Sequence, residues 1–249
     1  FDMWETYRIV VKHVFPDACC ITDHFHVIQE LTRRVDRVRI RVQNRFRKTI
    51  KTLKPKENNK TITPEEIVEL EEASRYYYVL KKFNWLLAST NKKILDVNVE
   101  RRFNRTLNRY LNYSEILAYM LNIDDELEEA FYLRNDVTYF YDHCTYDTAK
   151  KQLEKIIIDF RSSTVAEMSP FANTLTNWKK EIINSFIIVD DKANRKMNTA
   201  IVENRNKSIK LLKHASNGYL NWERFRNRIL YTLNEDTTFY YTSIRKDDK

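Results

Sequence analysis

Residues 27–53 read VIQELTRRVDRVRIRVQNRFRKTIKTL. Apolar side chains recur in this stretch at steps of three or four residues, namely Val27, Leu31, Val35, Val38, Val42, Phe46, Ile50 and Leu53. This period predicts a long α-helix with one buried stripe. Asp23 is well placed to cap its N-terminus. The stretch therefore favours a fold built on long helices.

Scarcity of turn-forming residues supports the same fold class. The chain has 249 residues but only one glycine and four prolines, whereas average usage would give about 17 glycines. A β-sandwich or barrel needs frequent tight turns, so both are disfavoured. A P-loop or a GxGxxG dinucleotide site needs at least two glycines close together, so both are excluded. We therefore predict a mainly α fold.

The positive charge of the chain is clustered. Net charge is +8. Residues 31–60 hold 12 Lys/Arg against Asp36 and Glu57, and residues 192–230 hold 10 against Glu203 and Glu223. The region between them has an excess of acids. Clustered basic charge is typical of proteins that bind polyanions such as nucleic acids, although it is also found on solvated helix faces.

The spacing of apolar residues and the positions of turn-forming and capping residues predict further elements. We expect a helix over 4–15, with Trp4, Tyr7, Val10, Val11, Val14 and Phe15 on its buried side, and a short buried strand over 18–22. A loop is expected over 54–63, followed by a helix with Thr63 as N-cap and Pro64 in its first turn. The chain is expected to be almost entirely helical from 65 to 161. Later helices are expected over 146–160, 171–186, 199–214 and 221–233, with a loop over 187–197 and a left-handed turn at Asn217-Gly218.

A second face of the long basic helix carries a row of arginines, namely Arg33, Arg37, Arg41 and Arg45. Arginine's planar guanidinium suits phosphate oxygens, so this arginine ridge could lie along a DNA backbone. Ion pairing with the acidic middle of the chain is the alternative interpretation.

Four residues are candidates for chemistry: Asp2, Asp23, His26 and Glu203. Carboxylates from distant parts of a chain are the ligands that Mg²⁺ requires. Lys207 and Lys210 share a helix face with Glu203 and could hold a nucleic-acid backbone. A zinc site from Asp23, His26, His143 and Cys144 is disfavoured, because the chain has no CxxC or HxxxH pair.

Two blocks of sequence resemble the ISL-three family of insertion-sequence transposases. The first comprises Asp2-Met3-Trp4, Tyr7, Phe15-Pro16, Ala18, Asp23, Phe25-His26 and Gln29. The second comprises Asn198, Ala200, Glu203, Asn206, Ile209-Lys210, Lys213, Gly218-Tyr219, Asn221, Phe225 and Arg228-Ile229-Leu230. His24 and His214 stand where arginine is usual in the family.

The resemblance implies a DDE transposase whose catalytic core is ribonuclease-H-like and interrupted by a helical insertion. Three domains are then expected: a partial core over 1–53, an all-helical insertion over 54–195, and the remaining core helices over 196–249. Asp2 and Glu203 would be the second and third acids of a two-metal site for Mg²⁺ or Mn²⁺. Asp23 and His26 would support that site, and the first acid would lie N-terminal to Phe1.

The implied partner is DNA, both the terminal inverted repeats of an insertion sequence and the target. Its contacts would be Arg33, Arg37, Arg41, Arg45, Lys207, Lys210 and Lys213. The resemblance further implies a bacterial, cytoplasmic, nucleoid-associated protein with no membrane partner, and homo-oligomerisation stays open. With its first acid outside it, this chain alone would be inactive. Two alternatives are a non-catalytic basic helical module for DNA binding or multimerisation, such as a decayed transposase remnant, and a helical protein-interaction domain.

Overall fold

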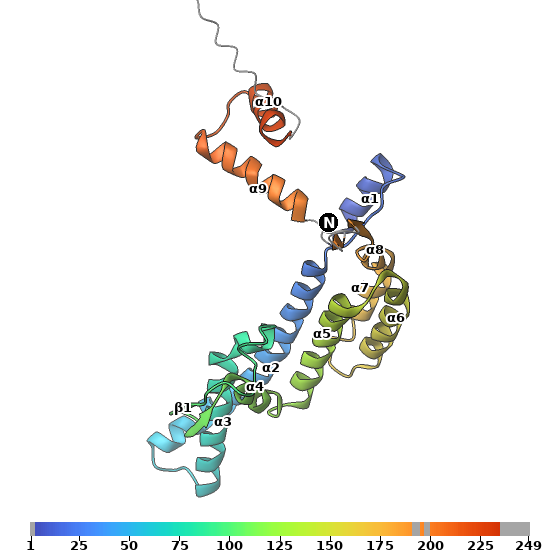
Figure 1. Cartoon of the computed structure of the whole chain (residues 1–249). Helices are drawn as coiled ribbons and strands as arrows, with labels where there is room; N and C mark the ends of the chain where they lie inside the picture. The colour runs from blue at the N-terminus through green and yellow to red at the C-terminus, as the bar shows by residue number, and fades with distance from the viewer. Residues whose placement is uncertain (1–2, 191–194, 197–199, 235–249) are drawn as a thin grey trace, which may run out of the picture. The chain divides into compact units, whose positions relative to one another are not determined.

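The computed structural model describes residues 3–190, 195–196 and 200–234, which form two compact units, Phe1–Met197 and Asn198–Lys249 (Figure 1). The predicted mainly helical class is confirmed. The larger unit contains α1 (Glu5–Val14), α2 (His24–Asn58), α3 (Pro64–Lys82), the 3-10 helix η1 (Asn84–Ala88), β1 (Arg102–Asn104), β2 (Arg109–Leu111), α4 (Tyr113–Leu121), α5 (Asp125–His143), α6 (Tyr146–Ser162), α7 (Phe171–Asn177), α8 (Lys179–Asn184), β3 (Ile188–Asp190) and β4 (Arg195–Lys196). The smaller unit contains α9 (Ala200–Ala215) and α10 (Trp222–Leu233).

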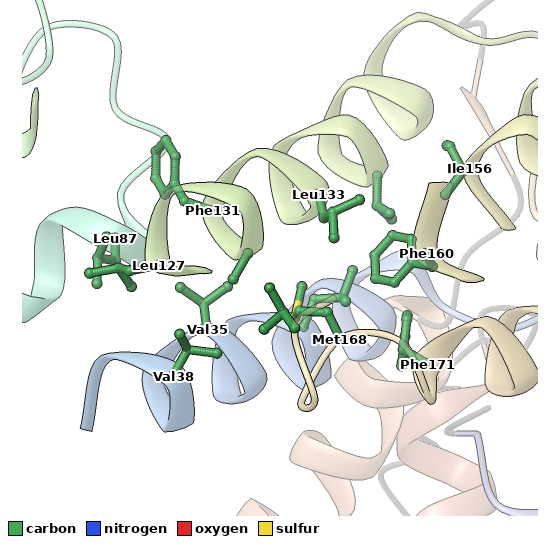
Figure 2. Packing of buried hydrophobic residues seen from close by; sticks show 14 of the residues in the cluster. Val35, Val38, Leu87, Leu127, Phe131, Leu133, Ile156, Phe160, Met168 and Phe171 are labelled. Carbon is green, nitrogen blue, oxygen red and sulfur yellow. The ribbon is translucent and has the colours of Figure 1, made fainter. Parts of the chain in front are cut away.

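Helix α2 is the longest helix of the larger unit, and it packs against both α3 and α5. The predicted stripe is buried at Val27, Leu31, Val35, Val38, Val42 and Leu53. Figure 2 shows Val35 and Val38 of α2 beside side chains of α5 and η1, and the core continues to Phe160 of α6 and Phe171 of α7. The same compact unit thus holds α2 and the helices expected to form the insertion.

The predicted helix starts agree with the structure. The Asp23 side chain accepts a hydrogen bond from the Phe25 amide at 2.9 Å. Thr63 and Glu66 form a reciprocal capping box at the start of α3, with Pro64 in the first turn. These local signals need no tertiary partner, which explains why the sequence alone reveals them.

The end of α9 also follows the prediction. Asn217 (φ 52°) and Gly218 (φ 95°) both have left-handed backbone conformations. The Gly218 amide donates to the Lys213 carbonyl at 2.9 Å and the Asn217 amide to His214 at 3.1 Å. This pair of bonds is the Schellman arrangement, which satisfies the last carbonyl groups of the helix.

The helix α1 is present, but its predicted burial is wrong. Trp4, Tyr7, Val10, Val14 and Phe15 are exposed, and α1 has no buried residue. The helix instead contacts α7 and α8 through its polar side. The Arg8 guanidinium lies 4.4 Å from the centre of the Trp178 ring and donates to the Asn177 carbonyl at 2.8 Å.

The predicted strand over 18–22 is also wrong. Cys20, Ile21 and Thr22 are buried as expected. However, the Thr22 amide donates to the Glu181 carbonyl at 3.1 Å, and the Asn184 side chain donates to the Cys20 carbonyl at 2.9 Å. The end of α8 therefore supplies the partners that a neighbouring strand would give, and no strand is assigned there in the described part of the chain.

The boundaries of the long helix and the following region need three corrections. Helix α2 continues past Pro55 to Asn58, so the connection to α3 is shorter than the predicted 54–63 loop. Pro55 has no backbone N–H to donate to the carbonyl of residue 51, and it lies in the last turn, so the helix ends three residues later at Asn58. Continuous helix after α3 is also wrong, since β1 and β2 form an antiparallel hairpin. The predicted loop over 187–197 contains β3 paired with β4.

The two sheets have only two strands each in the described residues. They do not form the larger sheet expected of a ribonuclease-H-like core, so that part of the fold prediction is not confirmed. Within the described ranges, each helix is too short or too polar to cross a bilayer.

Candidate functional site

Asp23 and His26 lie at the start of α2, and Asp23 is near Tyr141 of α5. The Asp23 side chain is only 8% exposed, and its Oδ1 lies 3.3 Å from His24 Nδ1. The Tyr141 side chain of α5 is buried beside it. Burial raises the pKa of Tyr141, and the negative charge of Asp23 raises it further. Asp23 is therefore both a helix cap and an uncommon buried carboxylate.

The zinc ligand set considered from sequence is not assembled. His26 is half-buried on α2, and His143 stacks on Tyr139 of its own helix with ring centres 3.9 Å apart. Among residues 3–190, 195–196 and 200–234, no group of three or more His, Cys, Asp or Glu side chains could hold a metal ion. Asp2 lies outside the described residues.

The arginine ridge of α2 divides into two parts. The C-terminal part, Arg41 and Arg45, is ion-paired within the protein. Arg41 Nε donates to Glu167 Oε1 at 2.8 Å and Nη2 to Oε2 at 2.9 Å, and Nη1 pairs with Glu126. Arg45 pairs with Asp124 at 2.7 Å and with Glu126 at 3.2 Å. These two arginines thus have the carboxylate partners that the ion-pairing alternative anticipated.

Replacing Glu167 by glutamine is expected to lower the free energy of unfolding by about 2 kcal/mol near neutral pH, because Arg41 loses a two-point charged partner. The hydrogen bond from Arg41 lowers the pKa of Glu167. This contribution is therefore complete above the pKa of the unfolded chain and is lost as the pH falls through the lower folded pKa.

Urea unfolding should thus separate the two proteins at about pH 7, and the difference should shrink as the pH is lowered below the ordinary range of a glutamate carboxyl. Asp125→Asn is the control, since Asp125 is an exposed acid in the neighbouring first turn of α5, and its effect should stay within about 0.5 kcal/mol. A pH-independent difference for Glu167→Gln would contradict the ion-pair explanation.

The second part of the ridge, Arg33 and Arg37, faces solvent. Their side chains are 59% and 56% exposed, with Glu30 carboxylate oxygens at 3.8 and 3.7 Å. Both line a cavity of about 500 Å³ together with Trp85 of η1. Weak pairing and high exposure leave these two guanidinium groups available to an anionic partner.

The remaining candidates lie on α9, in the smaller unit. Glu203 is exposed in the first turn of the helix, followed along the same side by Asn206, Lys207 and Lys210, all exposed. Lys213, one turn further on, is also exposed. The helix thus presents one carboxylate and a row of ammonium groups. A carboxylate such as Glu203 is the oxygen donor that Mg²⁺ or Mn²⁺ prefers.

One basic surface was missed from sequence. The β1–β2 hairpin carries exposed Arg102, Arg105 and Arg109 within a region that is acidic on average. The excess of acidic residues over 61–191 outweighs these arginines in the net charge of that region. The signal that could have revealed it is the position of Arg102 and Arg109 directly before Phe103 and Tyr110, since basic and aromatic residues together are typical of nucleic-acid surfaces.

Comparison with known proteins identifies the family. The family model of the ISL-three DDE transposases, described as a transposase, matches residues 1–229. The match covers the first block, the second block up to Ile229, and the helices between them. No curated protein and no solved structure matches the chain. The chain belongs to the ISL-three family of DDE transposases.

Proposed function

We propose that this chain is the C-terminal catalytic part of a transposase that cleaves DNA at insertion-sequence ends and joins the 3′ hydroxyl to target DNA. The observation that carries the proposal is the exposed face of α9. It places Glu203 beside Asn206, Lys207 and Lys210 within the region matched to the transposase family. A carboxylate next to backbone-binding cations is what metal-dependent phosphoryl transfer needs.

In this proposal Asp2 and Glu203 hold the divalent cations, with the first acid supplied by a segment N-terminal to Phe1. When bound, the metal ions activate the attacking oxygen and stabilise the leaving oxygen. The residues of this chain orient the DNA. Lys207, Lys210 and Lys213 neutralise phosphates near Glu203, and Arg33 and Arg37 do so on α2. Asp23 and His26 are positioning residues that support the metal site without ligating the metal.

The direct test is Glu203→Gln in a protein that also contains the segment with the first acid. We expect excision to be lost while DNA binding persists. Normal excision by this variant would overturn the proposal.

A non-catalytic DNA-binding module is the second candidate. Three exposed arginines of α10 favour this candidate, namely Arg224, Arg226 and Arg228. Together with the α9 lysines they make the two-helix unit basic, whether or not Glu203 binds a metal. If this candidate is correct, the protein that also contains the segment with the first acid, here called the longer protein, would cleave DNA no faster than background. Glu203→Gln would then change neither its DNA binding nor its cleavage. Loss of a measurable cleavage activity would exclude this candidate.

Both candidates predict salt-sensitive binding through α9. Lys207→Gln combined with Lys210→Gln should reduce the slope of log affinity against log salt by about 1.8, since each phosphate contact contributes about 0.9 on duplex DNA. Fluorescence anisotropy of a labelled duplex over a salt series measures this slope.

The control for that pair is Lys150→Gln with Lys151→Gln, which removes two exposed lysines from α6. The control should leave the slope unchanged. An unchanged slope in the α9 variant, or equal losses in both, would show that α9 is not the DNA-contacting face. Affinity that stays flat with salt in the unmodified chain would favour the protein-interaction alternative.

A further inference from the structure

The β1–β2 hairpin is held in a defined position by its turn and by the following helix cap. Asn104 Oδ1 accepts hydrogen bonds from the Thr106 and Leu107 amides, both at 3.1 Å, and the Leu107 side chain is buried in the core. The Asn112 side-chain amide donates to the Val97 carbonyl at 3.0 Å and to the Val99 carbonyl at 3.2 Å. The exposed side chains of the hairpin are therefore presented by a fixed backbone.

A cavity of about 620 Å³ lies between this hairpin, the end of α3 and the start of α4. Its walls include four aromatic side chains, namely Tyr78, Phe83, Phe103 and Tyr113. We call it the hairpin pocket. Its volume is within the range of small-ligand sites, and aromatic walls offer flat faces for stacking.

The charge at the hairpin pocket is positive. Lys82, Arg102 and Arg105 line it, against Glu100 as its one acid. Arg102 and Arg105 are exposed, and neither has a carboxylate partner within the part of the chain that the structure describes. The neighbouring Arg101 differs, since it makes a two-point ion pair with Glu115. The two pocket arginines thus remain available to an anion.

Lys82 links the charged and aromatic parts of the pocket. Its Nζ donates to the Tyr78 hydroxyl at 2.9 Å and lies 5.2 Å from the centre of the Tyr78 ring. Burial raises the pKa of Tyr78, but the hydrogen bond from Lys82 and those with Thr106 and Asn104 lower it by more. A cation is therefore held directly at an aromatic wall.

We propose that the hairpin pocket binds one unstacked nucleobase of a DNA strand, with the flanking phosphates paired to Arg102, Arg105 and Lys82. Aromatic faces beside unpaired cations suit a base and its backbone together. A base inside a duplex is stacked and paired, so only an unpaired or extruded nucleotide can enter. The inference rests on the proposed function for its choice of DNA, and it assigns to the insertion region a role in holding a single strand.

The test uses the 249-residue chain and a single-stranded oligonucleotide that contains a fluorescent purine analogue whose emission falls on stacking. Binding should quench this analogue, and it should be tighter for the single strand than for a duplex of the same sequence. Phe103→Leu should weaken single-strand binding about tenfold, which is typical of the loss of one stacking contact, and should change duplex binding less than about twofold. Phe103 is 48% exposed, so the variant is expected to fold.

The charge at the pocket is tested separately. Arg102→Gln with Arg105→Gln should reduce the salt slope for the single strand by about 1.4. The matched control, Lys92→Gln with Lys93→Gln, removes the same charge from exposed residues of the same connection that do not line the pocket. It should leave the slope nearly unchanged. Equal losses in the two double variants would overturn the pocket and leave only general electrostatic attraction.

Other outcomes also decide the question. Unchanged quenching in Phe103→Leu would overturn the proposal, as would preferential binding of an acidic aromatic peptide over the oligonucleotide. The pocket and the proposed catalytic function can be tested separately, because Glu203→Gln removes the proposed metal ligand but should leave quenching of the analogue unchanged. A longer protein that excises DNA without quenching the analogue would overturn the pocket alone, and quenching without excision would overturn the catalytic proposal alone.

Discussion

Replacing Glu203 by glutamine should reduce excision of an insertion sequence by about a thousandfold or more, measured in a protein that also contains the segment with the first acid. The glutamine amide keeps the size of the side chain but removes the negative charge that a hard divalent cation requires. A metal ion supplies several kcal/mol of charge stabilisation in phosphoryl transfer, and about 4 kcal/mol corresponds to three powers of ten in rate. Glu203 is exposed on α9, so the change should not disturb folding.

The measurement has two arms, excision of a marked insertion sequence and binding of its terminal DNA. Excision should be lost, while the dissociation constant for DNA should change by less than about threefold, because removal of one acid near a basic face cannot weaken phosphate contacts. Glu223→Gln is the matched control, since Glu223 is an exposed acid in the first turn of α10, within the same two-helix unit. It should retain excision. Loss of excision in both variants would point to a general effect of charge.

The sequence predicted the helices well where the signal is local. The apolar stripe from Val27 to Leu53 and the Thr63–Glu66 capping box depend on residues within a few turns of one another. The β1–β2 hairpin was missed because strands of three residues are too short to show a two-residue alternation. Its turn depends on Asn104 and on Asn108 with φ 49°, and asparagine is a weaker marker of such turns than glycine.

The partners of charged side chains were the part that sequence could not decide. Arg33 and Arg41 belong to the same predicted row of arginines, yet Arg41 pairs with Glu126 and Glu167 from distant segments, whereas the contact of Arg33 with Glu30 is long, at 3.8 Å. The choice depends on how α5 packs on α2, which is a tertiary property. The same holds for α1, where a strong amphipathic pattern did not lead to burial, and the helix instead makes contacts through Arg8 with Trp178 and Asn177.

The buried junction of α6 and α7 should be highly sensitive to truncation of its side chains. Phe160 is fully buried and lies against Phe171, with ring centres 5.7 Å apart (Figure 2). Phe160→Ala should lower the free energy of unfolding by about 3–5 kcal/mol, since it removes buried apolar surface and leaves a cavity lined by large side chains. A domain of this size is stabilised by only about 5–15 kcal/mol, so the variant should be close to the limit of folding.

Thermal unfolding followed by circular dichroism measures the effect, and a decrease in Tm of about 10 °C is expected, given about 2–4 °C for each kcal/mol in a unit of this size. Ile158→Ala is the control on the same helix, since Ile158 is 61% exposed and its replacement should cost no more than about 0.5 kcal/mol. Phe160→Leu should lie between the two, because it keeps most of the buried volume. Equal stability of Phe160→Ala and Ile158→Ala would show that α6 does not pack as described. The three variants together thus test how α6 packs in the core that it shares with α2 and α7.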